Sequence, residues 1–224
     1  MDATEETTKK RERQNNILDR LIDRPVGYLI SHDISPNFLS YFGFACSLGS
    51  AFFIAIGSIR LHVLIAWPAA FLLLFSGIFD IFDGAVARRT GTESKAGAFL
   101  DSNLDRLSDA VIVLGLIYGG IIDFSHGYLL LFVVVMISYT RSRAENEGVN
   151  MKGVGLMERA ERVIFLFIIF ILETWIYFIT GLVFGTPFAL FLPFVMMIYT
   201  GLLLFTVGQR LIFAFKKLKD VEAK

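Results

Sequence analysis

The chain has 224 residues, with 21 Lys and Arg residues balanced by 21 Asp and Glu residues, so its formal net charge is zero. Hydrophobic residues make up 55% of the sequence and aromatic residues 14%, well above the content of a typical soluble domain. This composition excludes a soluble globular enzyme, and the charge balance gives no reason to expect a nucleic-acid partner. The single cysteine, Cys46, excludes an intrachain disulfide.

The first 34 residues divide into a polar tail, 1–16, and a mixed segment, 17–34. In the second part, apolar side chains beginning with Ile17 fall on one helical face and charged side chains on the other. We predict a short amphipathic helix that lies in the membrane interface, ends near Pro25 and is followed by a turn. The tail has no short apolar core, so we expect no removable signal peptide.

From residue 37 to residue 215, long apolar runs alternate with short polar connections. A helix of about 20 residues is long enough to cross the hydrocarbon layer of a bilayer. We therefore predict an all-α integral membrane protein that forms a single membrane-embedded domain, 1–224. Its six transmembrane helices are expected at 37–57, 63–87, 97–121, 127–146, 159–183 and 187–215.

The positive charges are distributed unevenly between the two ends of these spans. Among the 21 Lys and Arg residues, only Arg60 falls in the three connections that we assign to the outer side. Because cytoplasmic loops are enriched in Lys and Arg, we expect both termini and the polar inner ends of the spans to be cytoplasmic, with the protein in the plasma membrane.

Two features inside the spans have more than one interpretation. Gly115 and Gly119, four residues apart in GLIYG, permit close helix contact either within one chain or between two chains. Glu173 lies deep in the fifth span, where a carboxylate is costly. It could be protonated, paired across a dimer or turned toward a cavity.

The segment DIFDGAVARRTGTESKAGAFLDSNLD, residues 80–105, concentrates carboxylates at the polar ends of two spans. Asp80 and Asp83 are about 60° apart on a helix, and Asp101 and Asp105 are four residues apart, so each pair shares a face. Four converging carboxylates repel one another unless they are neutralised, and hard divalent cations prefer such oxygen ligands. We predict a site for Mg²⁺, or Mn²⁺, holding two ions; the alternative is a set of membrane-boundary charges paired with arginines.

Small residues accompany these acids. Gly84, Ala87 and Gly97 leave one wall free of large side chains, so a ligand can approach the backbone there. Arg88 adds a planar guanidinium that suits phosphate. A divalent metal beside such an arginine at a membrane surface indicates phosphoryl chemistry on a lipid.

As a pattern, the segment is D-x2-D-G-x2-A-R-x8-G-x3-D-x3-D, which resembles the motif of the CDP-alcohol phosphotransferase family at every fixed position. The resemblance implies a homodimeric enzyme that moves a phosphatidyl-type group from a CDP-linked lipid to an alcohol and releases CMP. It also implies a role for individual residues: Asp80, Asp83, Asp101 and Asp105 as metal ligands, Asp105 also as general base, and Asn37, Gly84, Ala87, Arg88 and Ser94 as the surroundings of CDP.

Basic residues also gather around the connection between the fourth and fifth spans, at Arg141, Arg143, Arg159 and Arg162. Clustered guanidinium groups facing a metal site suit an acceptor that carries its own phosphate, although ordinary positive-inside residues would look the same. The run R-x-R-A-E-x-x-G followed by G-x-x-E-R-x-E-R resembles the phosphatidylinositol-phosphate synthase branch of the family and its archaeal counterpart.

We therefore expect an enzyme that uses CDP-archaeol or CDP-diacylglycerol and inositol 1-phosphate to make an inositol-phosphate phospholipid and CMP. Glycerol 3-phosphate is the alternative acceptor, because it also carries a phosphate. A divalent-cation carrier is the alternative of a different class. The outer halves of the spans have almost no polar residues to form the path that such a carrier needs.

Overall fold

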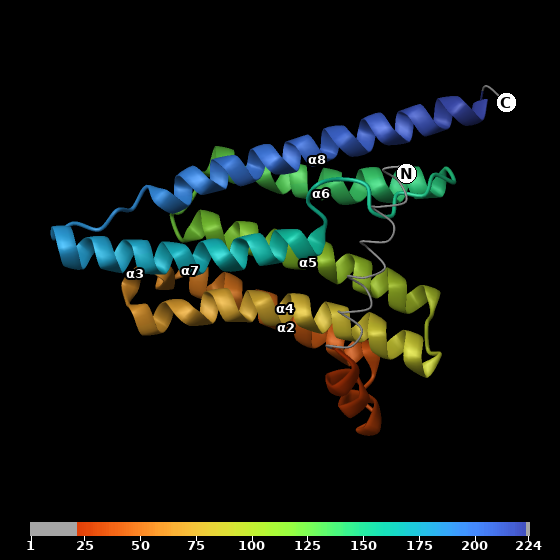
Figure 1. Ribbon diagram of the computed structural model, residues 1–224, viewed down its shortest axis with the longest axis horizontal. Helices are drawn as coiled ribbons and strands as arrows, with labels where there is room; N and C mark the ends of the chain where they lie inside the picture. The colour runs from red at the N-terminus through yellow and green to blue at the C-terminus, as the bar shows by residue number, and fades with distance from the viewer. Residues whose placement is uncertain (1–21, 223–224) are drawn as a thin grey trace, which may run out of the picture.

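The structure, a computed structural model, describes residues 22–222, and within that range it contains helices and connections but no β-strand. Its long helices lie side by side in one bundle (Figure 1). They are α2 (Pro36–Ala55), α4 (Val63–Thr90), α5 (Lys95–Tyr118), α6 (Phe124–Asn146), α7 (Arg159–Phe184) and α8 (Phe191–Glu222). A short helix, α3 (Ser58–Leu61), lies between α2 and α4.

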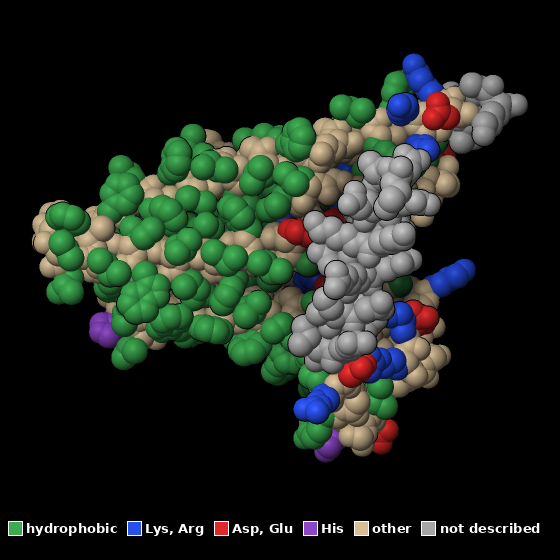
Figure 2. Space-filling model, in the orientation of Figure 1, with side chains coloured by type: hydrophobic (Ala, Val, Ile, Leu, Met, Phe, Trp, Pro, Cys, Tyr) green, Lys and Arg blue, Asp and Glu red, His purple; other side chains and the backbone are tan. Residues whose placement is uncertain are grey.

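Five of these helices, α2, α4, α6, α7 and α8, are long and apolar enough to cross a membrane. Helix α5 is not among them, because it carries Asp101, Asp105, Arg106 and Asp109 within its first two thirds. Hydrophobic side chains cover most of the visible length of the bundle, and charged side chains gather at one end (Figure 2). An all-helical membrane protein is thus confirmed, whereas a sixth span formed by α5 stays a prediction.

Capping residues fix the connection between α4 and α5. Helix α4 ends at Gly91, whose φ of +65° lies in the left-handed region that glycine adopts at little cost. Helix α5 begins after Ser94, whose side chain accepts a hydrogen bond from the Gly97 N–H. The connection, 91–94, is therefore short, and it brings together the acidic ends of the two helices.

The sixth predicted span, 187–215, differs most from the helix that the chain forms. Helix α8 begins at Phe191, because the preceding residues form a connection in which the Phe188 N–H donates to the Thr180 hydroxyl at 2.8 Å. It continues to Glu222, seven residues beyond the apolar run. Lysines in this extension favour a helix without favouring burial, so apolar content alone did not reveal it.

A further helix, 22–31, precedes α2 and runs across the direction of the bundle (Figure 1). Residues 1–21, with the polar tail and the first part of the predicted interfacial helix, lie outside the described residues. The prediction that this helix ends near Pro25 is wrong. Ile22 and the fully buried Val26 pack against α2 and α4, and these contacts extend the helix past the proline.

Helices α2 and α5 make close backbone contact through the two glycines of GLIYG. A Cβ atom on Gly115 would lie 2.8 Å from the carbonyl oxygen of Ala51, and one on Gly119 would overlap the carbonyl oxygen of Ile54. Any larger side chain would therefore push the helices apart. This spacing serves packing within one chain and gives no support to a dimer.

Glu173 is completely buried where α7 meets α3 and the start of α8. Arg60 donates from Nε to Glu173 Oε1 at 2.7 Å and from Nη2 to the Ala189 carbonyl at 2.6 Å. The Leu192 N–H donates to the second Glu173 oxygen at 3.1 Å. The carboxylate is thus paired within its own chain, and the interpretation of a pair across a dimer is wrong.

Replacing Glu173 with Leu should destabilise the purified protein. The substitution leaves Arg60, whose side chain is 24% exposed, without its carboxylate, and breaking one side of such a pair costs about 3–5 kcal/mol. Thermal unfolding in detergent should show a clearly lower midpoint. The double variant Arg60→Leu/Glu173→Leu serves as control and should recover much of the loss, whereas an unchanged midpoint in the single variant would contradict the assignment.

Candidate active site

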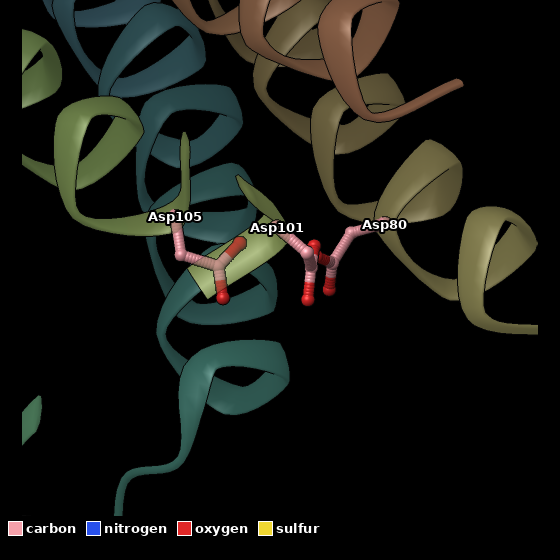
Figure 3. Close-up of side chains that lie close together, drawn as sticks. All are labelled: Asp80, Asp101 and Asp105. Atoms are coloured by element: carbon pink, nitrogen blue, oxygen red, sulfur yellow. The ribbon is translucent and has the colours of Figure 1, made fainter. Parts of the chain in front are cut away.

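Three aspartates meet at the charged end of the bundle. Asp80 comes from α4, and Asp101 and Asp105 come from successive turns of α5 (Figure 3). One carboxylate oxygen of each residue lies within 4.8 Å of those of the other two, and all three side chains are partly buried. The four-residue spacing on α5 and the short α4–α5 connection produce this convergence.

Arg159, the first residue of α7, closes the cluster. Its Nη1 atom forms ion pairs with Asp80 and with Asp105, the second at 2.5 Å. These carboxylates therefore already hold a cationic group. Among the described residues the potential ligands gathered here are carboxylates alone, without His or Cys, so the set suits a hard ion such as Mg²⁺ or Mn²⁺ better than Zn²⁺.

Asp83, the fourth predicted metal ligand, lies outside this group of three. Its side chain is buried, and Ser40 of α2 donates from Oγ to Asp83 Oδ2 at 2.5 Å. The angular offset between positions 80 and 83 on α4 turns Asp83 toward α2. All four aspartates nevertheless line one small cavity together with Arg159.

A cavity of about 580 Å³ opens on one side of the aspartates, a volume in the range of small-molecule binding sites. Four of the residues predicted to surround CDP line it, namely Asn37, Gly84, Ala87 and Ser94. We call this space the nucleotide-side cavity. Arg88 does not line it: the side chain is exposed and folds back over Gly84, where an added Cβ atom would lie 3.1 Å from Arg88 Nη1.

A second cavity, of about 420 Å³, lies on the other side of Asp101 and Asp105. Five arginines line it, and we therefore call it the arginine cavity; they are Arg106, Arg141, Arg159, Arg162 and Arg210. Five acidic residues line it as well, namely Asp101, Asp105, Glu145, Glu158 and Glu161. Asp101 lines both cavities, so the aspartate cluster separates them.

Arg143, predicted to join this group, is not part of the wall. Its side chain is 61% exposed and pairs with Glu147 at 2.5 Å. Positions 141 and 143 are two residues apart on α6, so their side chains point about 160° away from each other. Clustering in the sequence could not show which of the two arginines faces the cavity.

Arg210 was missed by the sequence analysis. It is buried in α8, and its guanidinium donates from Nε to the Val154 carbonyl and from Nη1 to the Ile137 carbonyl, both at 2.8 Å. These bonds tie α8 to α6 and to the α6–α7 connection. An arginine within a largely apolar helix is itself a sign of function, and that signal could have identified it.

A further ion pair lies beside the cluster. Arg162 Nη2 donates to Asp109 Oδ2 at 2.6 Å, one turn along both helices from the contact between Arg159 and Asp105. The two arginines of α7 therefore face two successive acids of α5. Both side chains of the second pair are largely buried.

Comparison with known proteins agrees with this geometry. The family model described as CDP-alcohol phosphatidyltransferase matches residues 33–207. The archaetidylinositol phosphate synthase of Pyrococcus horikoshii is 41% identical over 140 residues, which cover 62% of this chain and 71% of that protein. The synthase of the same name from Methanothermobacter thermautotrophicus is 37% identical over 154 residues, covering 67% of this chain and 71% of the relative.

Solved structures of the phosphatidylinositol phosphate synthase of Mycobacterium tuberculosis have the same fold. The structure with CDP-DAG bound has a TM-score of 0.66 at 26% identity, covering 88% of this chain and 94% of the other. The complex with manganese and citrate has a TM-score of 0.65 at 26% identity, covering 86% and 88%. The family match spans most of the chain and includes all four aspartates, and the protein is therefore a member of the CDP-alcohol phosphatidyltransferase family of enzymes.

Proposed function

We propose that the protein transfers the phosphatidyl-type group of a CDP-lipid to inositol 1-phosphate and releases CMP. Its relatives include archaetidylinositol phosphate and phosphatidylinositol phosphate synthases. The observation that carries the acceptor assignment is the arginine cavity beside the aspartates. A phosphorylated polyol can bind its phosphate to the guanidinium groups of Arg141 and Arg210 and turn its hydroxyls toward Asp105.

The donor would bind on the opposite side of the aspartates, in the nucleotide-side cavity. Gly84 has no side chain and Ala87 only a methyl group on this wall, so the flat cytosine and the ribose can approach the backbone of α4. Asn37 and Ser94 supply polar groups, and Arg88 stands near enough to turn toward the diphosphate. The donor would be CDP-archaeol or CDP-diacylglycerol, and its archaeol or diacylglycerol part would extend into the bilayer.

The carboxylates of Asp80, Asp83, Asp101 and Asp105 would hold Mg²⁺ or Mn²⁺, in our proposal as two ions. When bound, such ions withdraw charge from the diphosphate and stabilise the departing CMP. Asp105 lines the arginine cavity, where it would orient the acceptor hydroxyl and accept its proton as the new bond to phosphorus forms. The apolar core of the outer half of the bundle would keep water from competing with the acceptor.

We infer that the chain forms one catalytic domain in the plasma membrane, with six spans and both termini in the cytoplasm. Support comes from Arg60, the one Lys or Arg residue in the connections 56–62, 119–123 and 185–190, all of which the structure describes. The helix 22–31 lies across the bundle, as an interfacial helix would. The homodimer that the family resemblance implies remains part of the proposal.

An acceptor panel tests the proposed function. Purified protein in detergent would receive one CDP-lipid and Mg²⁺, with inositol 1-phosphate, glycerol 3-phosphate, inositol or serine, and CMP release would be measured. We expect turnover with inositol 1-phosphate. Turnover with glycerol 3-phosphate alone would overturn the acceptor and leave the reaction class in place.

Within that assay, Arg141→Gln should raise the KM for inositol 1-phosphate by about 10- to 100-fold, because a charge-assisted hydrogen bond to phosphate is worth about 1.5–3 kcal/mol. Arg143→Gln is the matched control. It removes the same charge two residues away on α6. Like Arg141, Arg143 pairs with a glutamate four residues later, but its side chain lies outside the cavity. Equal effects of the two substitutions would contradict a specific role for Arg141.

Ser40→Ala should weaken divalent-ion binding without removing a ligand. The substitution deletes the hydroxyl that holds Asp83, and one hydrogen bond of this kind corresponds to about a fivefold change in the dissociation constant. Titration calorimetry with Mn²⁺ would measure it. Ser47→Ala, on the same helix, removes a hydroxyl that pairs with Ser76 at 2.6 Å and should leave Mn²⁺ affinity unchanged.

A further inference from the structure

Arg159 occupies an unexpected position for a residue predicted to bind the acceptor's phosphate. Its guanidinium does not project freely into the arginine cavity; Nη1 contacts the carboxylates of Asp80 and Asp105. The side chain is 18% exposed, so water screens these contacts only partly. Two of the four proposed metal ligands are therefore already paired with one cationic group of the protein itself.

A guanidinium and a divalent ion compete for these oxygens. Arginine stays positively charged at every relevant pH and can only donate hydrogen bonds, so it cannot serve as a ligand beside the metal. Two cations on the same carboxylate pair repel each other strongly in partly buried surroundings. Metal binding through the same Oδ1 atoms of Asp80 and Asp105 therefore favours displacement of Arg159.

The arginine cavity provides the space for that movement. Arg159 already forms part of its wall, together with Glu158 and Glu161, which can accept hydrogen bonds from a displaced guanidinium. The neighbouring pair of Arg162 and Asp109 anchors the start of α7 on α5 at 2.6 Å. A change of side-chain rotamer is therefore sufficient, and α7 need not shift.

We propose that Arg159 is an internal counter-ion of the metal site, which metal binding displaces into the arginine cavity, where it then contributes to binding the phosphate of the acceptor. This inference rests on the proposed function. Arg159 is then a positioning residue that couples the two sites. By thermodynamic linkage, the metal increases the affinity for the acceptor, and the acceptor increases the affinity for the metal by the same factor.

Removing the competing charge should tighten metal binding. Titration calorimetry of metal-free protein with Mn²⁺ should give a dissociation constant about tenfold lower for Arg159→Gln than for the unsubstituted protein. Arg159→Lys keeps a cation at the cluster and should change affinity by less than about threefold. Arg162→Gln is the matched control. It removes the same charge one turn further along α7, where the paired acid, Asp109, lies outside the cluster. We expect it to change the Mn²⁺ dissociation constant by less than about threefold.

The coupling has its own measurement. For the unsubstituted protein, the dissociation constant of inositol 1-phosphate should fall at least about fivefold when Mg²⁺ replaces EDTA. In Arg159→Gln this ratio should decrease by half or more, because the variant has no guanidinium to release. Folding of each variant can be checked by thermal unfolding with Mn²⁺ present, which should restore the midpoint of Arg159→Gln if only the acids were left unpaired.

The outcomes separate the inference from the proposed function. If the unsubstituted protein binds no Mn²⁺, the metal site and the proposed reaction both fail. If it binds Mn²⁺ and Arg159→Gln binds with equal or lower affinity, Arg159 does not compete with the metal, and the counter-ion inference falls while the proposed function stands. The inference also falls if Arg162→Gln tightens Mn²⁺ binding as much as Arg159→Gln does.

Discussion

Asp105→Asn should reduce CMP release by at least about a thousandfold while CDP-lipid binding remains measurable. Asparagine has the shape of aspartate but cannot accept the proton of the acceptor hydroxyl, and proton transfer by a positioned base contributes about 10²- to 10⁴-fold to a rate. It also removes one of the three carboxylates that converge in the cluster, which weakens metal binding in addition. The two losses act on the same step and make this the most damaging conservative substitution.

Two measurements are needed for this variant, because loss of turnover alone does not locate the defect. Turnover is followed as CMP release, and donor binding as retention of a labelled CDP-lipid. Asp123→Asn is a suitable control, since Asp123 caps α6 at the opposite end of the bundle by accepting from the His126 N–H, and asparagine caps a helix equally well. Normal turnover by Asp105→Asn would show that the general base is another group.

Removing divalent ions should reduce CMP release at least as much as Asp105→Asn does. Without a metal, the negative charges of the aspartates would repel the diphosphate of the donor, and nothing would stabilise the departing CMP. CMP release should become undetectable in excess EDTA and should return when Mg²⁺ or Mn²⁺ is added back. The test requires both a CDP-lipid and an acceptor to be present throughout.

A control separates chelation from unfolding. Thermal unfolding in EDTA should still show a cooperative transition, because Arg159 pairs with Asp80 and Asp105 and reduces the repulsion between them. CMP release that continued unchanged in EDTA would contradict the metal-dependent mechanism. It would leave the family assignment untouched, since that assignment rests on the match over residues 33–207.

The aspartate cluster could be predicted because helix geometry and a short connection between two helices determine it. Residues four apart share a face of α5, and glycine and serine at the α4–α5 connection make the turn short, so the sequence is sufficient to bring Asp80, Asp101 and Asp105 together. The prediction that Asn37, Gly84 and Ser94 surround CDP came instead from the family resemblance, and the three residues line one cavity.

Pairs that are distant in the sequence could not be predicted in this way. Glu173 meets Arg60 only because α3 packs against α7, and Asp83 meets Ser40 only because α2 packs against α4. Helical spacing says nothing about which helices become neighbours, so the partner of a buried charge remains open until the packing is known. The position of Arg159 was missed for the same reason: its helix was predicted, but its contact with α4 and α5 was not.

The place of Asp101 in the walls of both cavities has a consequence for the order of events. A donor on one side and an acceptor on the other can occupy the protein together and meet only across the carboxylates. Neither has to leave before the other arrives, and no side chain has to carry the lipid phosphate in the interval. We therefore expect direct transfer within a ternary complex, with sequential rather than ping-pong kinetics and no covalent enzyme intermediate.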